Sequence, residues 1–258
     1  MINRDSITSW SLDHPWPESN QIEQDLLLSM AICEISNDEL LKDELVLRGG
    51  TAFHKLFMPS PFRYSEDLDY IRTNSGGIGD VMKELTVLGK RLGFDVSTKM
   101  GMYPKVYWRY TSENGIPSRI KIEINTYERE PRFNFINKEH KVDSSYYTGH
   151  ASVKTLEVEE LIASKIRALY QRSKGRDLYD IYLALDYLHI DIEKVLKAFP
   201  VYKPDNITRE LLLSNFELKM NDHQFLNDMS NLLRSDAPHY DAYSAGKIVK
   251  RDLLEKVL

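Results

Sequence analysis

The residues with the clearest chemical potential are two aspartates, Asp67 and Asp69, which are separated by one residue. In an extended strand, side chains at i and i+2 lie on the same face, so these carboxylates can share divalent cations. They also repel each other unless cations or hydrogen bonds compensate. An isolated D-x-D pair on a solvent-facing edge strand is common, so the pair alone favours an ordinary exposed strand.

A double glycine, Gly49 and Gly50, stands upstream of the pair and changes that interpretation. Residues 44–48 have the pattern of a strand, and Thr51 begins a predicted short helix. Backbone amides beside glycine approach phosphates closely, so Gly49, Gly50 and Thr51 are predicted to bind a nucleotide. Ser65, just before the aspartates, either lines the same site or forms a turn. The P-loop and dinucleotide-binding patterns are absent.

A third carboxylate, Glu123, lies in a segment, 119–124, where isoleucines alternate with polar residues. If this strand lies beside 67–72, Glu123 faces the aspartates. Three carboxylates there would suit two-metal nucleotidyl transfer, with ions roughly 3.5–4 Å apart. An exposed glutamate that pairs with Lys121 or Arg119 is equally compatible with the sequence.

A lysine further along, Lys165, falls within the apolar arc of a predicted helix over 156–171. Such a lysine either extends its ammonium to solvent or binds a triphosphate as a point charge. Arg176, Asp177 and Asp180 begin the next predicted helix. Asp177 and Asp180 would serve there as a cap and as a partner of the helix dipole, and the alternative is that one of them orients Lys165 or Arg176.

The elements that must position these residues change character along the chain. Up to about residue 150 the patterns are mixed, and beyond Thr155 they are helical, which predicts an α+β fold with domains 1–150 and 151–258. Ser19 is a candidate cap of the first predicted helix. The expected strands are 44–48, 67–72, 94–99, 104–111 and 118–126, and the expected helices are 19–35, 37–44, 51–57, 80–93, 156–171, 177–189, 191–199, 205–218, 221–234 and 244–257.

The formal net charge of −5 argues against a protein whose whole surface binds nucleic acid, although local basic sites remain possible. One run of cations without a carboxylate covers 161–176. A second group surrounds two predicted strands and comprises Lys99, Lys105, Arg109, Arg119 and Lys121. A single cysteine, Cys33, and the lack of a long apolar stretch or a secretory signal predict a cytoplasmic protein without a membrane span.

Four blocks in this order, LRGGTAFHKLF, RYSEDLDY, IKIEIN and LIASKIRALYQRSKGRDLYDIY, resemble the nucleotidyltransferase toxins of the AbiEii/MenT type. The resemblance covers roughly residues 44–190. It implies a fold similar to DNA polymerase β with an added helical domain. It also implies one half of a toxin–antitoxin or phage-defence pair, with a separate antitoxin protein. Characterised relatives transfer nucleotides to the 3′ end of tRNA, which blocks aminoacylation and stops growth.

The resemblance also assigns roles to residues of this chain. It implies that Gly49 and Gly50 form the glycine motif, that Asp67 and Asp69 bind metal, and that Lys165, Arg176, Asp177 and Asp180 complete the active site. It raises the expectation that Ser65 lines the site. The implied donor is an NTP and the implied cofactor is Mg²⁺, with two ions held by Asp67, Asp69 and Glu123. The predicted tRNA contacts are Arg167, Arg172 and Lys174.

Two alternatives stay open from the sequence. In the first, the acceptor of the nucleotide is a protein or a small, aminoglycoside-like molecule. In the second, the chain is a non-catalytic nucleotide-binding module. A tRNA acceptor implies steep salt dependence through phosphate contacts, whereas a small acceptor does not.

Overall fold

The computed structural model describes residues 2–257, which form two compact units. The first unit comprises the chain up to Glu130, Phe135–Leu156 and Arg234–Asp236, and the second comprises Pro131–Asn134, Glu157–Leu233 and the chain from Ala237 onward. The predicted domain boundary at residue 150 falls within a strand of the first unit, Thr148–Thr155.

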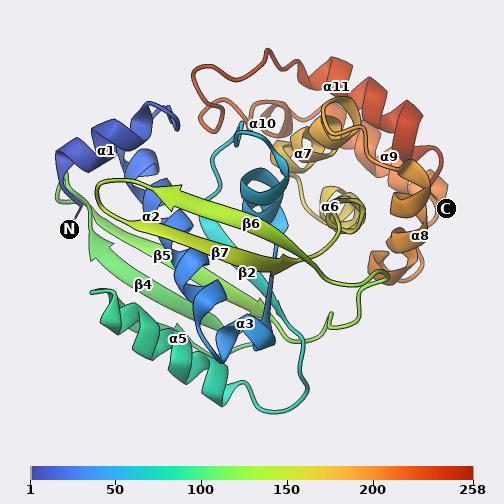
Figure 1. Cartoon of the computed structure of the whole chain (residues 1–258). Coiled ribbons are helices and arrows are strands. Elements are labelled where there is room, and N and C mark those ends of the chain that lie inside the picture. The colour runs from blue at the N-terminus through green and yellow to red at the C-terminus, as the bar shows by residue number, and fades with distance from the viewer. Residues whose placement is uncertain (1, 258) are drawn as a thin grey trace. The chain divides into compact units, whose positions relative to one another are not determined.

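A seven-stranded mixed sheet forms the centre of the first unit, with the strand order β3-β4-β5-β2-β1-β7-β6 (Figure 1). β2 runs parallel to β5, and β1 runs parallel to β7, whereas the other neighbours are antiparallel. The strands are β1 (Leu45–Arg48), β2 (Asp67–Arg72), β3 (Asp95–Lys99), β4 (Lys105–Thr111), β5 (Pro117–Asn125), β6 (Ile136–Asp143) and β7 (Thr148–Thr155). The predicted α+β class is confirmed, and the strands expected up to residue 126 are present.

Helices of the first unit pack on this sheet, and α1 packs on α2 (Figure 1). They are α1 (Arg4–Ser11), α2 (Ser19–Asn37), α3 (Leu41–Glu44), α4 (Gly49–Ala52), the π-helical turn η1 (Phe53–Phe57) and α5 (Gly79–Arg91). The predicted cap of α2 is wrong. Ser19 is the first helical residue, and Glu18 caps the helix through a reciprocal capping box with Gln21.

The core of the first unit follows from alternation along the strands. Ile120, Ile122 and Ile124 of β5 are fully buried, whereas the residues between them lie on the opposite, polar face. On the neighbouring strand β4, Trp108 is also fully buried and donates through its indole nitrogen to the Leu85 carbonyl of α5, at 3.0 Å. One face of the sheet is therefore committed to packing, and the other is available for chemistry.

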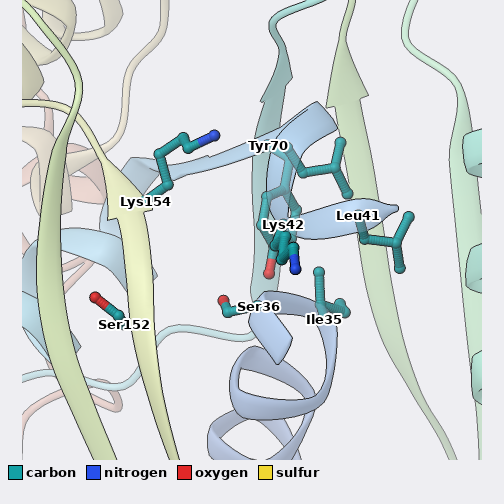
Figure 2. Close-up of a pocket in the computed structure, with 8 residues that line it drawn as sticks. Ile35, Ser36, Leu41, Lys42, Tyr70, Ser152 and Lys154 are labelled. Carbon is teal, nitrogen blue, oxygen red and sulfur yellow. The ribbon is translucent and has the colours of Figure 1, made fainter. Parts of the chain in front are cut away.

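Tyr70 marks the buried side of β2. Its hydroxyl has no hydrogen-bond partner among the residues that the structure describes, and its ring borders a cavity of about 10 Å³. Figure 2 draws the side chains that line this cavity, which come from α2, α3 and the adjoining strands. This volume holds about one water molecule, so the cavity is too small for a nucleotide.

Residues 234–236 return to the first unit. The backbone amide of Arg234 donates to the Phe62 carbonyl at 3.2 Å, and its guanidinium donates to Ser60 Oγ. The next amide, that of Ser235, donates to the Pro15 carbonyl. This short segment therefore binds the chain between α1 and α2, and again just after the glycine turn and η1.

The second unit consists of helices. They are α6 (Val158–Gln171), α7 (Gly175–Asp186), α8 (Ile192–Tyr202), α9 (Arg209–Met220), α10 (His223–Leu226), α11 (Ala242–Val249) and the π-helical turn η2 (Lys250–Leu254). The predicted helix over 221–234 is mostly wrong, because α10 ends at Leu226. There Asn227 turns its amide back to the His223 carbonyl, at 2.9 Å. Among residues 2–257, no helix is long and apolar enough to cross a membrane.

Candidate active site

The strand β2 presents Asp67 and Asp69 on the polar face of the sheet. Both aspartates are half-buried. Leu68, between them, and Tyr70, which follows, point into the core. The parallel register places Asp69 opposite Glu123 of β5. The condition under which Glu123 faces the aspartates, a strand 119–124 beside 67–72, is therefore met, and three carboxylates share one face.

Two lysines balance this negative charge. Lys121 Nζ lies 2.7 Å from Asp67 Oδ2 and 3.6 Å from Glu123 Oε2, and Lys105 Nζ lies 3.1 Å from the same Glu123 oxygen. Glu123 therefore also makes the ion pair that the sequence left open. Within residues 2–257, no three His, Cys, Asp or Glu side chains are arranged as a ready metal-binding set.

Asp69 is the carboxylate whose charge is least well compensated. Burial raises its pKa, and the nearby charge of Asp67 raises it further. The positive charge of Arg48, which is paired with Asp69 in the register of β1 and β2, lowers the pKa of Asp69. The negative charge of Glu123 raises it. A cation bound at Asp67 and Asp69 would stabilise both ionised carboxylates, so this pair fits a divalent metal.

The glycine turn lies directly against this pair. Gly49 has a φ of +78°, which disfavours other residues, and a Cβ there would lie 2.6 Å from Asp69 Oδ2. A Cβ on Gly50 would overlap the Arg63 guanidinium and lie 3.3 Å from Ser65 Oγ. Glycine is thus needed at both positions to let the backbone approach Asp69 and Ser65.

Thr51 ties the turn to β2. Its side chain is buried, its hydroxyl donates to the Asp67 carbonyl at 2.5 Å, and the same oxygen lies 2.9 Å from Ser65 Oγ. Thr51 was predicted to bind nucleotide, and the contacts it makes here position the Asp67 backbone.

Two arginines beside the turn did not emerge from the sequence reasoning. Arg48 ends β1 and pairs with Glu128 at 2.6 Å, and Arg63 is buried and donates to the Tyr64 carbonyl at 2.9 Å. Arg48 stands within LRGGTAFHKLF and Arg63 within RYSEDLDY, so their closeness to the two motifs was the available signal. No local spacing indicates the pairing of Arg48 with the distant Glu128, or the approach of the Arg63 guanidinium to Gly50.

The second unit holds the other predicted residues in a buried ion-pair cluster. Lys165 Nζ of α6 lies 2.5 Å from Asp180 Oδ2 and 3.4 Å from Asp177 Oδ1, both on α7. All three residues are buried, and both aspartates are fully so. Lys165 therefore does not extend to solvent, and its ammonium is held by two carboxylates.

Arg172 completes this cluster. Its Nε lies 2.7 Å from Asp177 Oδ2 and its Nη2 lies 2.9 Å from Asp177 Oδ1, a bidentate geometry. Burial would raise the Asp177 pKa, but Lys165 and Arg172 lower it below its usual value. Lys174, and not Asp177, is the N-cap residue of α7, so the capping interpretation of Asp177 is wrong.

The remaining cations of the basic run also have neighbours. Arg176 and Lys174 lie 3.8 and 3.9 Å from the Asp228 carboxylate, and the Arg167 guanidinium stands 5.6 Å from the centre of the Tyr202 ring. In the first unit the structure gathers seven of the predicted site residues, namely Gly49, Gly50, Thr51, Ser65, Asp67, Asp69 and Glu123. In the second unit it gathers Lys165, Asp177 and Asp180, with Arg176 on the same helix.

A glycine turn against an Asp-x-Asp strand in a mixed sheet is the arrangement that the resemblance to nucleotidyltransferases implied. The chain belongs to the AbiEii family. The family model described as "Nucleotidyl transferase AbiEii toxin, Type IV TA system" matches residues 33–247. The chain is therefore a nucleotidyltransferase toxin of a toxin–antitoxin system.

One solved structure shares the fold. The chain is similar to MenT4, a nucleotidyltransferase toxin from Mycobacterium tuberculosis H37Rv, with 16% identity, a TM-score of 0.51, and coverage of 96% of this chain and 99% of that chain. An antigenic nucleotidyltransferase-like protein from Paracoccidioides brasiliensis matches with 15% identity, a TM-score of 0.42, and coverage of 95% and 94%. A search of curated proteins gives no significant match.

Proposed function

We propose that this toxin transfers a nucleotide from an NTP to the 3′ end of tRNA, with Mg²⁺ as cofactor. The observation that supports it most strongly is the approach of the Gly49 backbone to Asp69, beside Asp67 on the same face. This arrangement suits a triphosphate and its cations because it joins backbone amides to a carboxylate pair. Membership of the AbiEii family supports the reaction class.

The residues of the first unit have distinct roles in this proposal. The amides of Gly49 and Gly50, with the Ser65 hydroxyl, bind the phosphates of the donor, and Thr51 holds the turn against β2. Asp67 and Asp69 hold the metal, and Glu123 is the third ligand once Lys105 and Lys121 release it. Bound Mg²⁺ would neutralise the triphosphate and lower the pKa of the attacking hydroxyl.

The second unit contributes Lys165, Asp177, Asp180 and Arg176 to the same reaction in this proposal, as the family resemblance implies. The two aspartates fix the Lys165 ammonium, so its charge is positioned in advance. Arg167, Arg172 and Lys174 are proposed tRNA contacts, of which Arg172 is already paired with Asp177. The proposed setting is the bacterial cytoplasm, where a separate antitoxin protein controls the activity.

A transfer assay tests the proposal. Purified protein is incubated with Mg²⁺, bulk tRNA and each α-labelled NTP in turn, beside an Asp67→Asn variant. Asp143→Asn is the matched control, since Asp143 is an exposed carboxylate of the same unit. We expect label in tRNA with the wild type and Asp143→Asn, and background with Asp67→Asn.

Other results redirect or overturn the proposal. Label in a protein or an aminoglycoside, and not in tRNA, would retain nucleotidyl transfer and replace the acceptor. Equal transfer by Asp67→Asn and the wild type would remove the carboxylate pair from the mechanism. Absence of any Mg²⁺-dependent NTP binding would leave a non-catalytic module.

A further inference from the structure

The second group of cations in the sequence converges on one face of the sheet. The antiparallel register pairs Lys99 with Lys105, and Arg109 with Arg119, and opposite residues of a pair share a face. Lys121 lies opposite Asp67 in the parallel pair of β5 and β2. All five cations therefore lie on the face that carries the aspartates. We call Lys99, Lys105, Arg109, Arg119 and Lys121 the basic face.

The opposite face of the same strands is closed by packing. Val106, Trp108, Ile120 and Ile122 are fully buried there, and Trp108 packs on Gly89 of α5. By contrast, the outer members of the basic face are exposed, namely Lys99, Arg109 and Arg119. The strand β5 thus separates a packed apolar layer from a charged surface.

The charge on this surface is only partly compensated. Lys105 and Lys121 pair with Glu123 and Asp67, but Lys99, Arg109 and Arg119 make no ion pair within residues 2–257. Asp95, which lies opposite Arg109 on β3, is also not in ion-pair contact with it. Like charges opposite one another destabilise a sheet, so the pairing of Arg109 with Arg119 costs stability.

The cations of the 161–176 run differ in this respect. Lys165 and Arg172 are held by the aspartates of α7, and Lys174 and Arg176 lie close to Asp228. A polyanion would have to displace these carboxylates, whereas it meets uncompensated charge at Arg109 and Arg119. The basic face is therefore the better polyanion site of the two.

Aromatic rings are interleaved with these cations. Tyr107 lies between Lys105 and Arg109 on β4, and the Arg119 guanidinium stands 5.0 Å from the centre of its ring. Tyr103 and Tyr127 are exposed beside the ends of β4 and β5, with ring centres 6.2 Å apart at 87°. Exposed aromatics beside cations are typical of surfaces that bind single-stranded nucleic acids, because bases stack on rings.

We propose that the basic face binds the single-stranded end of the acceptor RNA. Arg109, Arg119 and Lys99 contact its phosphates, and Tyr103 and Tyr127 stack on its bases. Three strand spacings separate Lys99 from Asp69 along the register, a distance of about 14 Å. One sheet can therefore hold both the reacting end and the nucleotides behind it. The choice of an RNA acceptor rests on the proposed function.

Binding of a fluorescent single-stranded oligoribonucleotide tests this assignment without catalysis. Anisotropy is measured without Mg²⁺ or NTP, over a range of salt concentrations, for the wild type and Arg109→Gln/Arg119→Gln. The matched control is Lys83→Gln/Lys90→Gln, which removes the same charge from exposed positions of α5. We expect binding by Arg109→Gln/Arg119→Gln to weaken about tenfold, with a log–log salt slope shallower by about 1.4, and no change in the control.

A stacking variant separates RNA from an acidic protein as the ligand. Tyr127→Ala should weaken RNA binding about tenfold while the salt slope stays unchanged, because stacking releases no counterions. Polyglutamate is the competitor. If it displaces the RNA at equal charge concentration and Tyr127→Ala has no effect, the face binds an acidic polypeptide and the proposal is overturned.

The outcomes also separate this proposal from the proposed function. RNA binding that is lost in Arg109→Gln/Arg119→Gln, in a protein that transfers no nucleotide, supports the basic face and overturns the transfer reaction. Transfer to RNA with equal binding by both double variants supports the reaction and overturns the basic face. Equal weakening in both double variants would indicate general charge attraction and would also overturn it.

Discussion

At Gly49 two independent constraints exclude a side chain. Its φ of +78° strains any other residue, and a Cβ would contact the Asp69 carboxylate. Gly115 has nearly the same φ, +76°, but faces open space. Comparing alanine substitutions at the two sites separates backbone strain from contact with the candidate active site.

We predict that Gly49→Ala and Gly115→Ala each lose about 1–3 kcal/mol of unfolding free energy, because each places alanine in the left-handed region. Only Gly49→Ala should also lose nucleotide transfer, since it displaces Asp69. Denaturant unfolding and the transfer assay measure the two effects. Full activity of a folded Gly49→Ala protein would contradict the role of this turn.

A second residue-scale prediction concerns His140. Burial lowers its pKa to about 4, and the charge of Lys55 adds to the shift. The unfolded chain, with an ordinary histidine pKa near 6.5, binds more protons between these values, so stability is lost as pH falls from about 6.5 to 4.

The free energy of unfolding of the wild type should therefore decrease between pH 7 and pH 5 by more than that of His140→Gln. The full effect of the shift is at most about 3 kcal/mol. His150→Gln is the control, because His150 is an exposed histidine on the neighbouring strand. The same pH dependence in the wild type and His140→Gln would rule out His140 as its source.

At the scale of elements, α5 is held against the sheet by the contact of Gly89 with Trp108. A Cβ at Gly89 would overlap the indole ring, so Gly89→Ala should destabilise the protein by about 1–3 kcal/mol. Alanine normally stabilises a helix relative to glycine, by about 1 kcal/mol. Gly79, the first residue of the same helix, faces open space, and Gly79→Ala should not destabilise. The melting temperatures of the two variants check this prediction.

The sequence predicts five of the seven strands and misses β6 and β7. The strands up to residue 126 were predictable because isoleucines, leucines and aromatics alternate with polar residues, as in β5. The strands β6 and β7 were not predicted, because their inner positions include His140, Ala151 and Thr155, which do not stand out as apolar. Their burial depends on α2 and β1, which pack against them in the fold.

The candidate site divides in the same way. The shared face of Asp67 and Asp69 was predictable because alternation along a strand sets it, whereas the approach of Gly49 to Asp69 depends on the pairing of β1 and β2. The contacts of Arg48 with Glu128, and of Lys105 with Glu123, join distant segments and depend on strand register. Arg172 and Asp177 are close in sequence, but their pairing depends on the conformation of the turn between α6 and α7.

At the scale of the whole molecule, the two units do not correspond to two consecutive stretches of sequence. The segment Arg234–Asp236 belongs to the first unit although helices of the second unit precede and follow it. Arg234 is buried, and its guanidinium contacts Ser60 and makes a bidentate pair with Asp236.

We predict that Arg234→Ala lowers the unfolding free energy by about 1.5–3 kcal/mol, since it removes charged hydrogen bonds from a buried position. It should also expose the 58–65 segment to protease. Arg251→Ala is the control, because Arg251 is exposed and pairs with its neighbour Asp252. Wild-type protease resistance in Arg234→Ala would contradict the prediction.

The segment Arg234–Asp236 also affects how the protein folds during its synthesis. A nascent chain cannot complete the first unit until residue 236 has left the ribosome, because Phe62 and Pro15 receive their backbone hydrogen bonds from Arg234 and Ser235. Phe62 adjoins Arg63, the residue that lies against Gly50. A chain whose translation stops before residue 234 therefore lacks the hydrogen bond to Phe62, close to the glycine turn. The first unit of the toxin is completed only late in synthesis.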